Sequence, residues 1–430
     1  MIPFAIMLLT IAIGPLVAEH WWEKNTNKLI ISFILGVPTA IYLIVNGKAQ
    51  NLEHQLLNDY LPFIILLCSL FVVTGGIHLS GDIKAKPIIN TGFLGLGWLL
   101  ASVMGTTGAA MLLIRPVLAT NSQRKYTAHT VLFFIALIAN CGGLLTPLGD
   151  PPLFLLYLRG AEFTWFLHLL PEWALTGILL LVIYYIMDSY YYKKEDWTKL
   201  SADTREVQPL RITGKINLLY LLGIVVAVAF VNGSYIDAMK AEDAPIWVKY
   251  LREIILISLI FLSLYTTKKK VREDNHFAWG PIIEVAVVFL GIFTTMTPAM
   301  IFLRENAASL GLTQPWQFYY CTGALSSFLD NAPTAVAFYE LAFGLDANTL
   351  NTLYNNAPIV ASIPEILLKA ISIGAVFFGA MTYIGNGPNF MVKAIAEQSG
   401  VKMPSFFGYM IKFSLIILLP IYIIVQLIFF

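Results

Sequence analysis

The chain has 430 residues, of which 58% are hydrophobic and only 12% are charged. A soluble domain carries about 25% charged residues, so this composition argues against an ordinary soluble enzyme or binding module. The net charge of +1 gives no electrostatic reason to expect nucleic acid as a partner. The composition instead predicts an all-α polytopic membrane protein.

Apolar segments follow one another along the whole chain, and a simple membrane crossing needs about 20 residues. They lie at residues 2–18, 28–46, 60–79, 92–118, 130–158, 171–192, 215–232, 250–266, 280–303, 314–343, 364–396 and 404–429. The first lacks the basic start and A-x-A site of a signal peptide, so we expect a retained spanning helix. The three cysteines lie singly in apolar runs without metal-ligand spacing, so we interpret them as small buried hydrophobic residues and expect no cofactor.

Two of the long segments, 92–118 and 314–343, have small or polar residues at their middles. These middles read "ASVMGTTGAAM" and "ALSSFLDNAPTAV", and they predict two re-entrant helical hairpins that enter and leave the membrane on one side. The other two long segments, 130–158 and 364–396, are predicted to cross the membrane as discontinuous helices.

The two discontinuous segments are interrupted at corresponding places. Residues 144–154 read "LLTPLGDPPLF", and residues 381–392 read "MTYIGNGPNFMV". Adjacent prolines cannot continue a helix, and in a bilayer the freed carbonyls and the Asp150 carboxylate must face protein or a water-filled cavity. An alignment without gaps pairs Thr146 with Thr382, Gly149 with Gly385, Asp150 with Asn386, Pro152 with Pro388 and Phe154 with Phe390. Such paired breaks predict the binding site of a transporter.

The distribution of lysine and arginine predicts the orientation in the membrane. The basic clusters are Lys24/Lys28, Lys84/Lys86, Arg124/Lys125, the loop 193–215 and Lys268–Arg272. If 92–118 is a hairpin, all five clusters lie on one face, which the positive-inside rule places in the cytoplasm. This assignment predicts ten crossings and two hairpins in the cytoplasmic (inner) membrane, with both termini on the non-cytoplasmic side.

The same order of elements predicts an inverted repeat. Residues 1–192 would form the first repeat, residues 193–214 a cytoplasmic linker, and residues 215–430 the second repeat, which starts from the opposite face. The hairpin tips also align, pairing Ser102 with Ser327, Gly105 with Asp330, Thr106 with Asn331, Gly108 with Pro333 and Ala110 with Ala335. An inverted repeat places both tips and both breaks around one site near the midplane.

Polar side chains at the tips and breaks are the candidate ligands. Carboxylates inside a membrane are costly, which makes Asp150 and Asp330 functional candidates. A dehydrated Na⁺ needs hard oxygen ligands, so we predict a Na⁺ site formed by Asp150, Asp330 and Asn331. Further candidate ligands are Thr106, Thr146, Thr382, Asn386 and Asn389. The alternative is that some of these residues only cap broken helix ends. Arg115 either pairs with a carboxylate inside the bundle or extends to the cytoplasm.

The motifs "TPLGDPP", "FLDNAPT" and "GNGPNF" together resemble the ion transporter superfamily, in particular its branch of NhaD-type sodium/proton antiporters and arsenite permeases. The resemblance covers essentially the full chain. It implies a homodimer with a scaffold domain, and a transport domain of hairpins and broken helices that moves as an elevator. The dicarboxylate branch has Ser-Asn-Thr at both tips, whereas this chain has Gly105-Thr106-Thr107 and Asp330-Asn331-Ala332. The acidic tip favours a cation as substrate.

These features predict a secondary active transporter that exchanges Na⁺ or Li⁺ for H⁺. Asp150 and Asp330 would be alternately protonated or ion-bound, and competition for the same carboxylates is enough to give exchange. The alternative is a citrate-like organic anion or arsenite permease coupled to Na⁺ or H⁺. An enzyme is not expected, because the sequence offers no nucleophile–base set or metal cluster. A channel is disfavoured by the paired hairpins.

Overall fold

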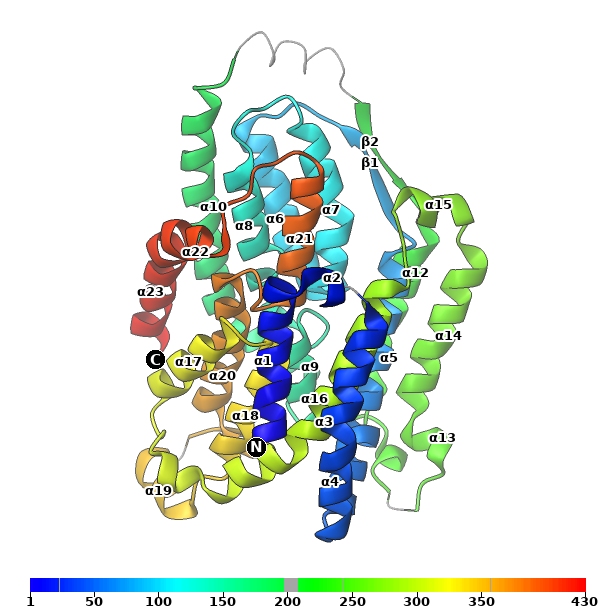
Figure 1. The fold of residues 1–430 in the computed structure, drawn as a ribbon, viewed down its shortest axis with the longest axis vertical. Helices are drawn as coiled ribbons and strands as arrows, with labels where there is room; N and C mark the ends of the chain where they lie inside the picture. The colour runs from blue at the N-terminus through cyan, green and yellow to red at the C-terminus, as the bar shows by residue number, and fades with distance from the viewer. Residues whose placement is uncertain (23, 197–207, 242, 356) are drawn as a thin grey trace.

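Helices form most of this computed structural model, which describes residues 1–22, 24–196, 208–241, 243–355 and 357–430 (Figure 1). The elements up to residue 192 are α1 (Ile2–Val17), α2 (Glu19–Trp22), α3 (Asn25–Val45), α4 (Ala49–His54), η1 (Gln55–Tyr60), α5 (Leu61–Thr74), β1 (His78–Asp82), α6 (Pro87–Met104), α7 (Thr106–Thr120), α8 (Ala128–Leu137), η2 (Cys141–Leu145), α9 (Pro151–Leu158), η3 (Phe163–Leu169) and α10 (Leu170–Tyr192).

The second part of the chain supplies the elements from residue 208 onward. They are β2 (Gln208–Thr213), α12 (Ile216–Phe230), η4 (Asp237–Met239), α13 (Ile246–Lys249), α14 (Leu251–Thr266), α15 (Lys269–Asp274), α16 (Gly280–Glu305), η5 (Ala307–Leu310), α17 (Pro315–Ser326), α18 (Asn331–Phe343), α19 (Ala347–Leu353), β3 (Ile359–Val360), β4 (Ile363–Pro364), α20 (Glu365–Phe378), η6 (Gly379–Met381), α21 (Gly387–Gln398), α22 (Phe406–Tyr409), η7 (Met410–Leu418) and α23 (Leu419–Phe429).

Long apolar helices confirm a polytopic membrane protein. Within the described residues, seven helical stretches are long and apolar enough to cross a bilayer, namely Asn25–Val45, Ala49–Thr74, Pro87–Met104, Ala128–Leu145, Phe163–Tyr192, Gly280–Glu305 and Phe406–Phe429. Large apolar side chains are exposed on six of these stretches, all except Ala128–Leu145, and such a surface suits contact with lipid. The count of ten crossings, the orientation and the inverted repeat stay predictions.

Both segments expected to form hairpins consist of two shorter helices packed against each other. The first hairpin turns at Gly105, between α6 and α7, where the φ of 79° is a conformation that glycine adopts without strain. The second turns at residues 327–330, between α17 and α18. Either turn leaves one helix N-terminus, at Thr106 or Asn331, at the tip of its hairpin.

Two features differ from the predicted all-α pattern. The third apolar segment, expected at 60–79, belongs to a helix that runs from 49 to 74 through the π-helical turn η1. Beyond it, β1 pairs antiparallel with β2, with His78 opposite Thr213, and β3 pairs with β4. The helix ends at Gly75 and Gly76, and Asn217 donates a hydrogen bond of 2.9 Å to the Gly76 carbonyl, which leaves the following residues free to form the ribbon.

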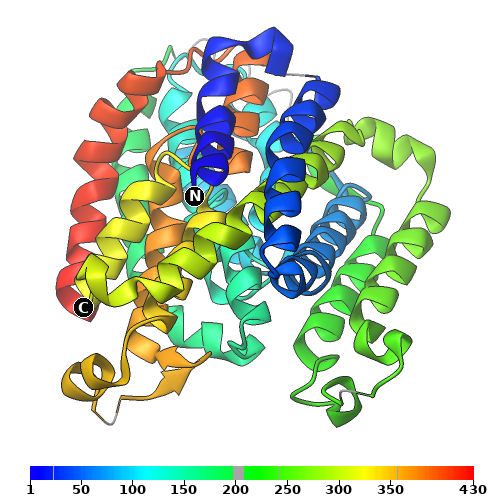
Figure 2. The same cartoon turned by 60° about the horizontal axis from the view of Figure 1, so that its bottom comes forward.

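The broken helices occupy the middle of the molecule. Every residue of α8 after Ala128 is buried, and 89% of the stretch Ala128–Leu145 is buried. By contrast, α12, α13 and α14 form a separate edge, visible in green in both views (Figures 1 and 2). This placement follows from the need to keep irregular backbone away from hydrocarbon.

Candidate functional site

The two breaks share one backbone conformation. In the first, the turn η2 leads into extended Thr146 (φ −147°, ψ 158°), and extended Asp150 (φ −142°, ψ 142°) begins α9. In the second, η6 leads into Thr382 (φ −139°, ψ 169°), and Asn386 (φ −150°, ψ 141°) begins α21. The prolines lie within the first turns of α9 and α21, where a missing backbone donor costs little. They therefore start the second half-helix and do not form the interruption itself.

A glycine contact closes each break. A Cβ atom added to Gly149 would lie 2.0 Å from the Gly143 carbonyl oxygen, and one added to Gly385 would lie 2.7 Å from the Gly379 carbonyl oxygen. Real Cβ atoms essentially never come this close to backbone, so both positions require glycine. The close approach lets the chain cross itself and begin a second helix within a few residues.

Thr146 and Thr382, both predicted as ligands, attach each break to the adjacent hairpin. The Thr146 hydroxyl donates to the Ser102 carbonyl oxygen, and the Thr382 hydroxyl donates to the Ser327 carbonyl oxygen. Each hydroxyl also accepts a hydrogen bond from a backbone N–H two residues further on. These threonines are thus engaged with the backbone, in matching positions of the two breaks.

Asp150 is the point where the tips and breaks meet. Its side chain is buried, with the residue 1% exposed, and accepts hydrogen bonds from three uncharged donors. Thr106 Oγ1 lies 2.9 Å from Oδ1, Asn386 Nδ2 lies 3.1 Å from Oδ1, and Asn331 Nδ2 lies 2.5 Å from Oδ2. One donor comes from each hairpin tip and one from the second break. Three of the predicted ligands, Thr106, Asn331 and Asn386, therefore gather around the carboxylate of a fourth, Asp150.

No basic side chain among the described residues forms an ion pair with Asp150. Within the described part of the chain, it is the one buried carboxylate that forms no ion pair with a basic side chain. The other buried acids pair as Asp59–Arg159, Glu172–Lys369, Asp188–Arg124, Glu195–Arg124, Glu253–Arg252 and Glu340–Arg304. A charged Asp150 thus depends on dipoles alone, or on a cation from outside.

Asp330 and Asn331 stand at the tip of the second hairpin. The Asp330 carboxylate accepts a hydrogen bond of 3.0 Å from the Ala332 N–H and so caps α18, whereas neither Asp150 nor Asn386 caps its own helix. The capping interpretation therefore applies to Asp330. Asn331 is fully buried, and its Oδ1 atom has no hydrogen-bond partner among the described residues. Such an unpaired acceptor suits a bound cation or water.

A small cavity of about 130 Å³ adjoins this cluster, with room for several water molecules. Its polar lining includes Thr106, Asp330 and Asn386, and its apolar wall comes from α5 and α16, while none of the described lining residues is basic. The residues on both sides of Asp150 also line it. The first turns of α7, α9, α18 and α21 begin at or beside the cavity, so four positive helix ends converge there.

Asn140 is a site residue that sequence reasoning missed. Its Nδ2 donates 2.7 Å to Asn389 Oδ1, and its Oδ1 accepts 3.2 Å from Asn386 Nδ2, so it links two of the predicted residues. Asn389 in turn donates to the Gly379 and Thr382 carbonyls and lies in the layer behind Asp150. The signal for Asn140 was a single amide in the apolar run before the first break.

Comparison with known proteins agrees with this architecture. The comparison with curated proteins finds no match to the chain. A family model described as "Putative citrate transport" matches residues 1–430, which is the entire chain. This family is a membrane transporter family of the ion transporter type, and the match does not distinguish the NhaD-type branch. The chain therefore belongs to the family described as "Putative citrate transport".

Proposed function

We propose that this protein is a secondary active transporter that exchanges Na⁺ or Li⁺ for H⁺, and that Asp150 is the carboxylate both cations share. One observation carries the proposal: Asp150 is buried, accepts hydrogen bonds from both hairpin tips and the second break, and has no basic partner among the described residues. A buried carboxylate without a countercharge binds either a proton or a metal cation, because an isolated charge is very costly in a low-dielectric interior.

The oxygen atoms around Asp150 suit Na⁺ as cargo. Asp150 and Asp330 supply carboxylate oxygens, and Asn331 Oδ1 is a buried acceptor without a partner among the described residues. The amide and hydroxyl groups of Asn331, Asn386 and Thr106 are uncharged, so they orient the carboxylate without competing with the ion. Because H⁺ and Na⁺ neutralise the same group, binding of one releases the other.

We further propose how the site is exposed to each side of the membrane. The hairpins and broken helices would form the moving transport domain, and α5 and α16, which supply the apolar wall of the cavity, would belong to the scaffold. This division follows from the proposed inverted repeat of residues 1–192 and 215–430, joined by the linker 193–214. We expect a homodimer in the cytoplasmic membrane, with both termini outside, that acts as a transporter and not as an enzyme.

Citrate transport coupled to a cation is the second candidate. The family description supports it, and so do the four helix N-termini at the cavity, which favour negative charge. The two aspartates and the absence of a basic residue from the described lining weigh against a bare anion. Citrate would therefore need both carboxylates to be protonated or cation-bound first.

Proteoliposomes with an internal pH-sensitive dye test these candidates. Vesicles with a preset pH gradient are pulsed with Na⁺, Li⁺, K⁺ or citrate, each with an inert counterion. We expect Na⁺ and Li⁺ alone to dissipate the gradient, and K⁺ to have little effect. The antiport proposal fails if the gradient responds only when citrate is present, which is the result expected of the second candidate.

A further inference from the structure

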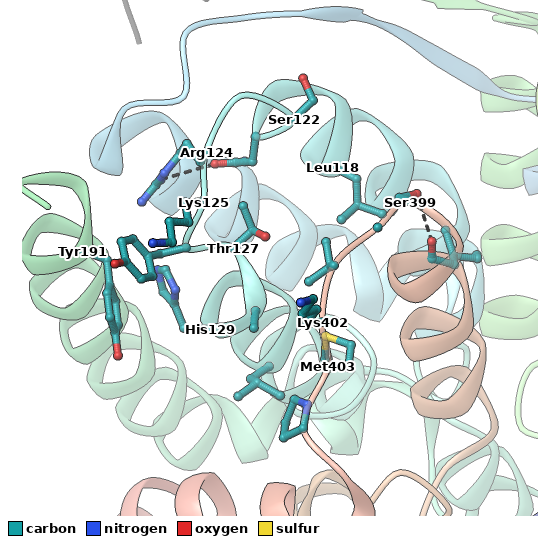
Figure 3. A pocket seen from close by; sticks show the side chains of 18 of the residues that line it. Leu118, Ser122, Arg124, Lys125, Thr127, His129, Tyr191, Ser399, Lys402 and Met403 are labelled. Carbon is teal, nitrogen blue, oxygen red and sulfur yellow. Dashed lines mark hydrogen bonds between the residues drawn. The ribbon is translucent and has the colours of Figure 1, made fainter. Parts of the chain in front are cut away.

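A large basic cavity lies at the opposite end of α21 from Asp150. Its volume is about 1160 Å³, and it is enclosed by the end of α7, the loop 121–128, the ends of α10 and α21, and the start of the last helical segment. Lys125, His129 and Tyr191 lie on one side of it, and Ser399, Lys402 and Met403 lie on the other (Figure 3). The transport site does not use these residues.

The positive charge of this basic cavity is only partly compensated. Arg124 and His129 both bind the buried Asp188, at 2.5 and 2.8 Å. Lys402 and Lys412, by contrast, form no ion pair among the described residues, and no described lining residue is acidic. The cavity therefore favours an anionic ligand.

Arg115 lines this cavity with a hydrogen-bond donor that has no acceptor among the described residues. Its Nη1 atom is shielded from solvent and has no hydrogen-bond partner in the described structure. The ion pairs of the described residues include no carboxylate partner for Arg115, and its extension towards the cytoplasm stays a prediction. A buried donor without an acceptor calls for a bound group, and a guanidinium matches the geometry of a phosphate.

The position of the basic cavity relative to the membrane indicates what the anion is attached to. The cavity is bounded where α7 and α10 end and where α8 and α22 begin, and hence where apolar segments meet water. Gly408, Lys412 and Ile417 of the last segment line its side. On that same segment Phe407, Ile411 and Ile416 are 69%, 58% and 65% exposed, so they face acyl chains in a bilayer. Basic residues at this level are typical of the cytoplasmic leaflet.

We infer that the basic cavity binds the phosphate headgroup of an anionic phospholipid from the cytoplasmic leaflet. Lys402, Lys412 and Arg115 would neutralise the phosphate, and the hydroxyls of Ser122 and Thr127 offer further hydrogen bonds. The acyl chains would lie along the exposed apolar side chains of the last segment. Basic pockets between helices on this side of a membrane are suited to anionic headgroups. A free phosphate ion could bind the same basic side chains, but it has no acyl chains to cover the exposed apolar side chains of the last segment.

Lipid retention by the whole purified protein tests this inference, whichever ion is transported. The protein in neutral detergent is incubated with phosphatidylglycerol or phosphatidylcholine, and bound lipid is measured by native mass spectrometry alongside the thermal midpoint. We expect phosphatidylglycerol to be retained and to raise the midpoint, and phosphatidylcholine to do neither. The double variant Lys402→Gln/Lys412→Gln should weaken phosphatidylglycerol binding by about tenfold or more, since each lysine near an anionic surface contributes roughly fivefold.

Three comparisons make the test decisive. The control Lys269→Gln/Lys270→Gln removes two exposed positive charges from α15, outside the cavity, and should leave binding within about twofold of wild type. The variant Lys402→Arg/Lys412→Arg keeps the charges and should retain the lipid, which separates a charge effect from misfolding. The inference is overturned if the control loses as much binding as the test variant, or if glycerol 3-phosphate, inorganic phosphate or citrate alone raises the midpoint as much as the lipid.

Discussion

Asp150 and Asn386 begin two half-helices, α9 and α21, and their side chains bind each other across the molecule. Asn386 Nδ2 lies 3.1 Å from Asp150 Oδ1, and neither side chain makes a capping hydrogen bond to its own helix. The contact joins residues 236 positions apart in the chain. A change in the charge of Asp150 therefore changes the strength of a hydrogen bond made by Asn386, in the second break.

Removing the charge of Asp150 should abolish coupling without unfolding the protein. Asp150→Asn keeps nearly the same shape, and Asp330→Asn retains a good helix cap. We expect either variant to lose Na⁺-driven H⁺ release from vesicles and the Na⁺-dependent rise in thermal midpoint. At 100 times the dissociation constant that ligand stabilisation amounts to about 2.7 kcal/mol. Glu273→Gln is the control, because Glu273 pairs with Lys269 at the surface of α15, outside the site, and normal exchange by both Asn variants contradicts the antiport proposal.

Acidification should weaken Na⁺ binding. H⁺ and Na⁺ compete for Asp150, so the Na⁺ complex is favoured at high pH and lost as the pH falls. Once the free carboxyl is mostly protonated, the apparent Na⁺ affinity should drop by about tenfold per pH unit. Titration of tryptophan fluorescence with Na⁺ at several pH values measures this slope. A pH-independent affinity would mean that H⁺ and Na⁺ bind at separate places.

A single methyl group should disrupt the first break. In Gly149→Ala the new Cβ meets the Gly143 carbonyl at 2.0 Å, and backbone cannot move aside as a side chain does. We expect a loss of about 1–3 kcal/mol in stability and of transport. The control Gly92→Ala lies in α6, where an added Cβ has nothing within 4 Å, and should be neutral or stabilising by about 0.5–1 kcal/mol. Thermal unfolding and vesicle transport of the two variants make the comparison, and equal behaviour would rule out the tight crossing.

The ion cluster around Asp188 should matter for stability and not for coupling. Asp188→Ala would leave Arg124, whose side chain is fully buried, without its closest partner. Breaking such a buried pair costs about 3–5 kcal/mol. The thermal midpoint should therefore fall, while the increment added by Na⁺ stays unchanged. Loss of that increment would place Asp188 in the ion pathway.

Cysteine labelling tests the proposed orientation. With Cys68 and Cys321 changed to serine, Lys193→Cys should react with an impermeant maleimide only from the cytoplasmic side. Leu353→Cys, at the end of α19 in the connection that follows the second hairpin, should react only from outside. Both positions are exposed, so accessibility within the fold does not limit the reaction. Labelling of both from one side is incompatible with the inverted repeat.

Much of the site could be predicted, because polar and helix-breaking residues inside an apolar segment cost free energy unless they have a structural or functional role. A carboxylate, prolines and glycines inside apolar segments have few tolerated placements, so Asp150, Thr106, Asn331 and Asn386 were predicted to gather and do so. The direction of the Asp330 side chain was not predictable, because a rotamer that caps α18 and one that enters the cavity fit the same sequence. Asn140 carried no periodic signal in its apolar run. The β1–β2 ribbon joins segments too distant for any local pattern to indicate.

That ribbon also bears on how the protein is made. β1 is synthesised about 130 residues before β2, its partner, which corresponds to roughly 6 to 26 seconds of translation at about 5–20 residues per second. During that interval the backbone groups of β1 are an unpaired strand edge next to the emerging chain. Residues 1–196 can therefore enter the membrane early, but β1 has no partner strand until β2 has been synthesised. Pairing of the two strands must wait until residues 208–213 leave the ribosome, so this part of the tertiary fold forms late.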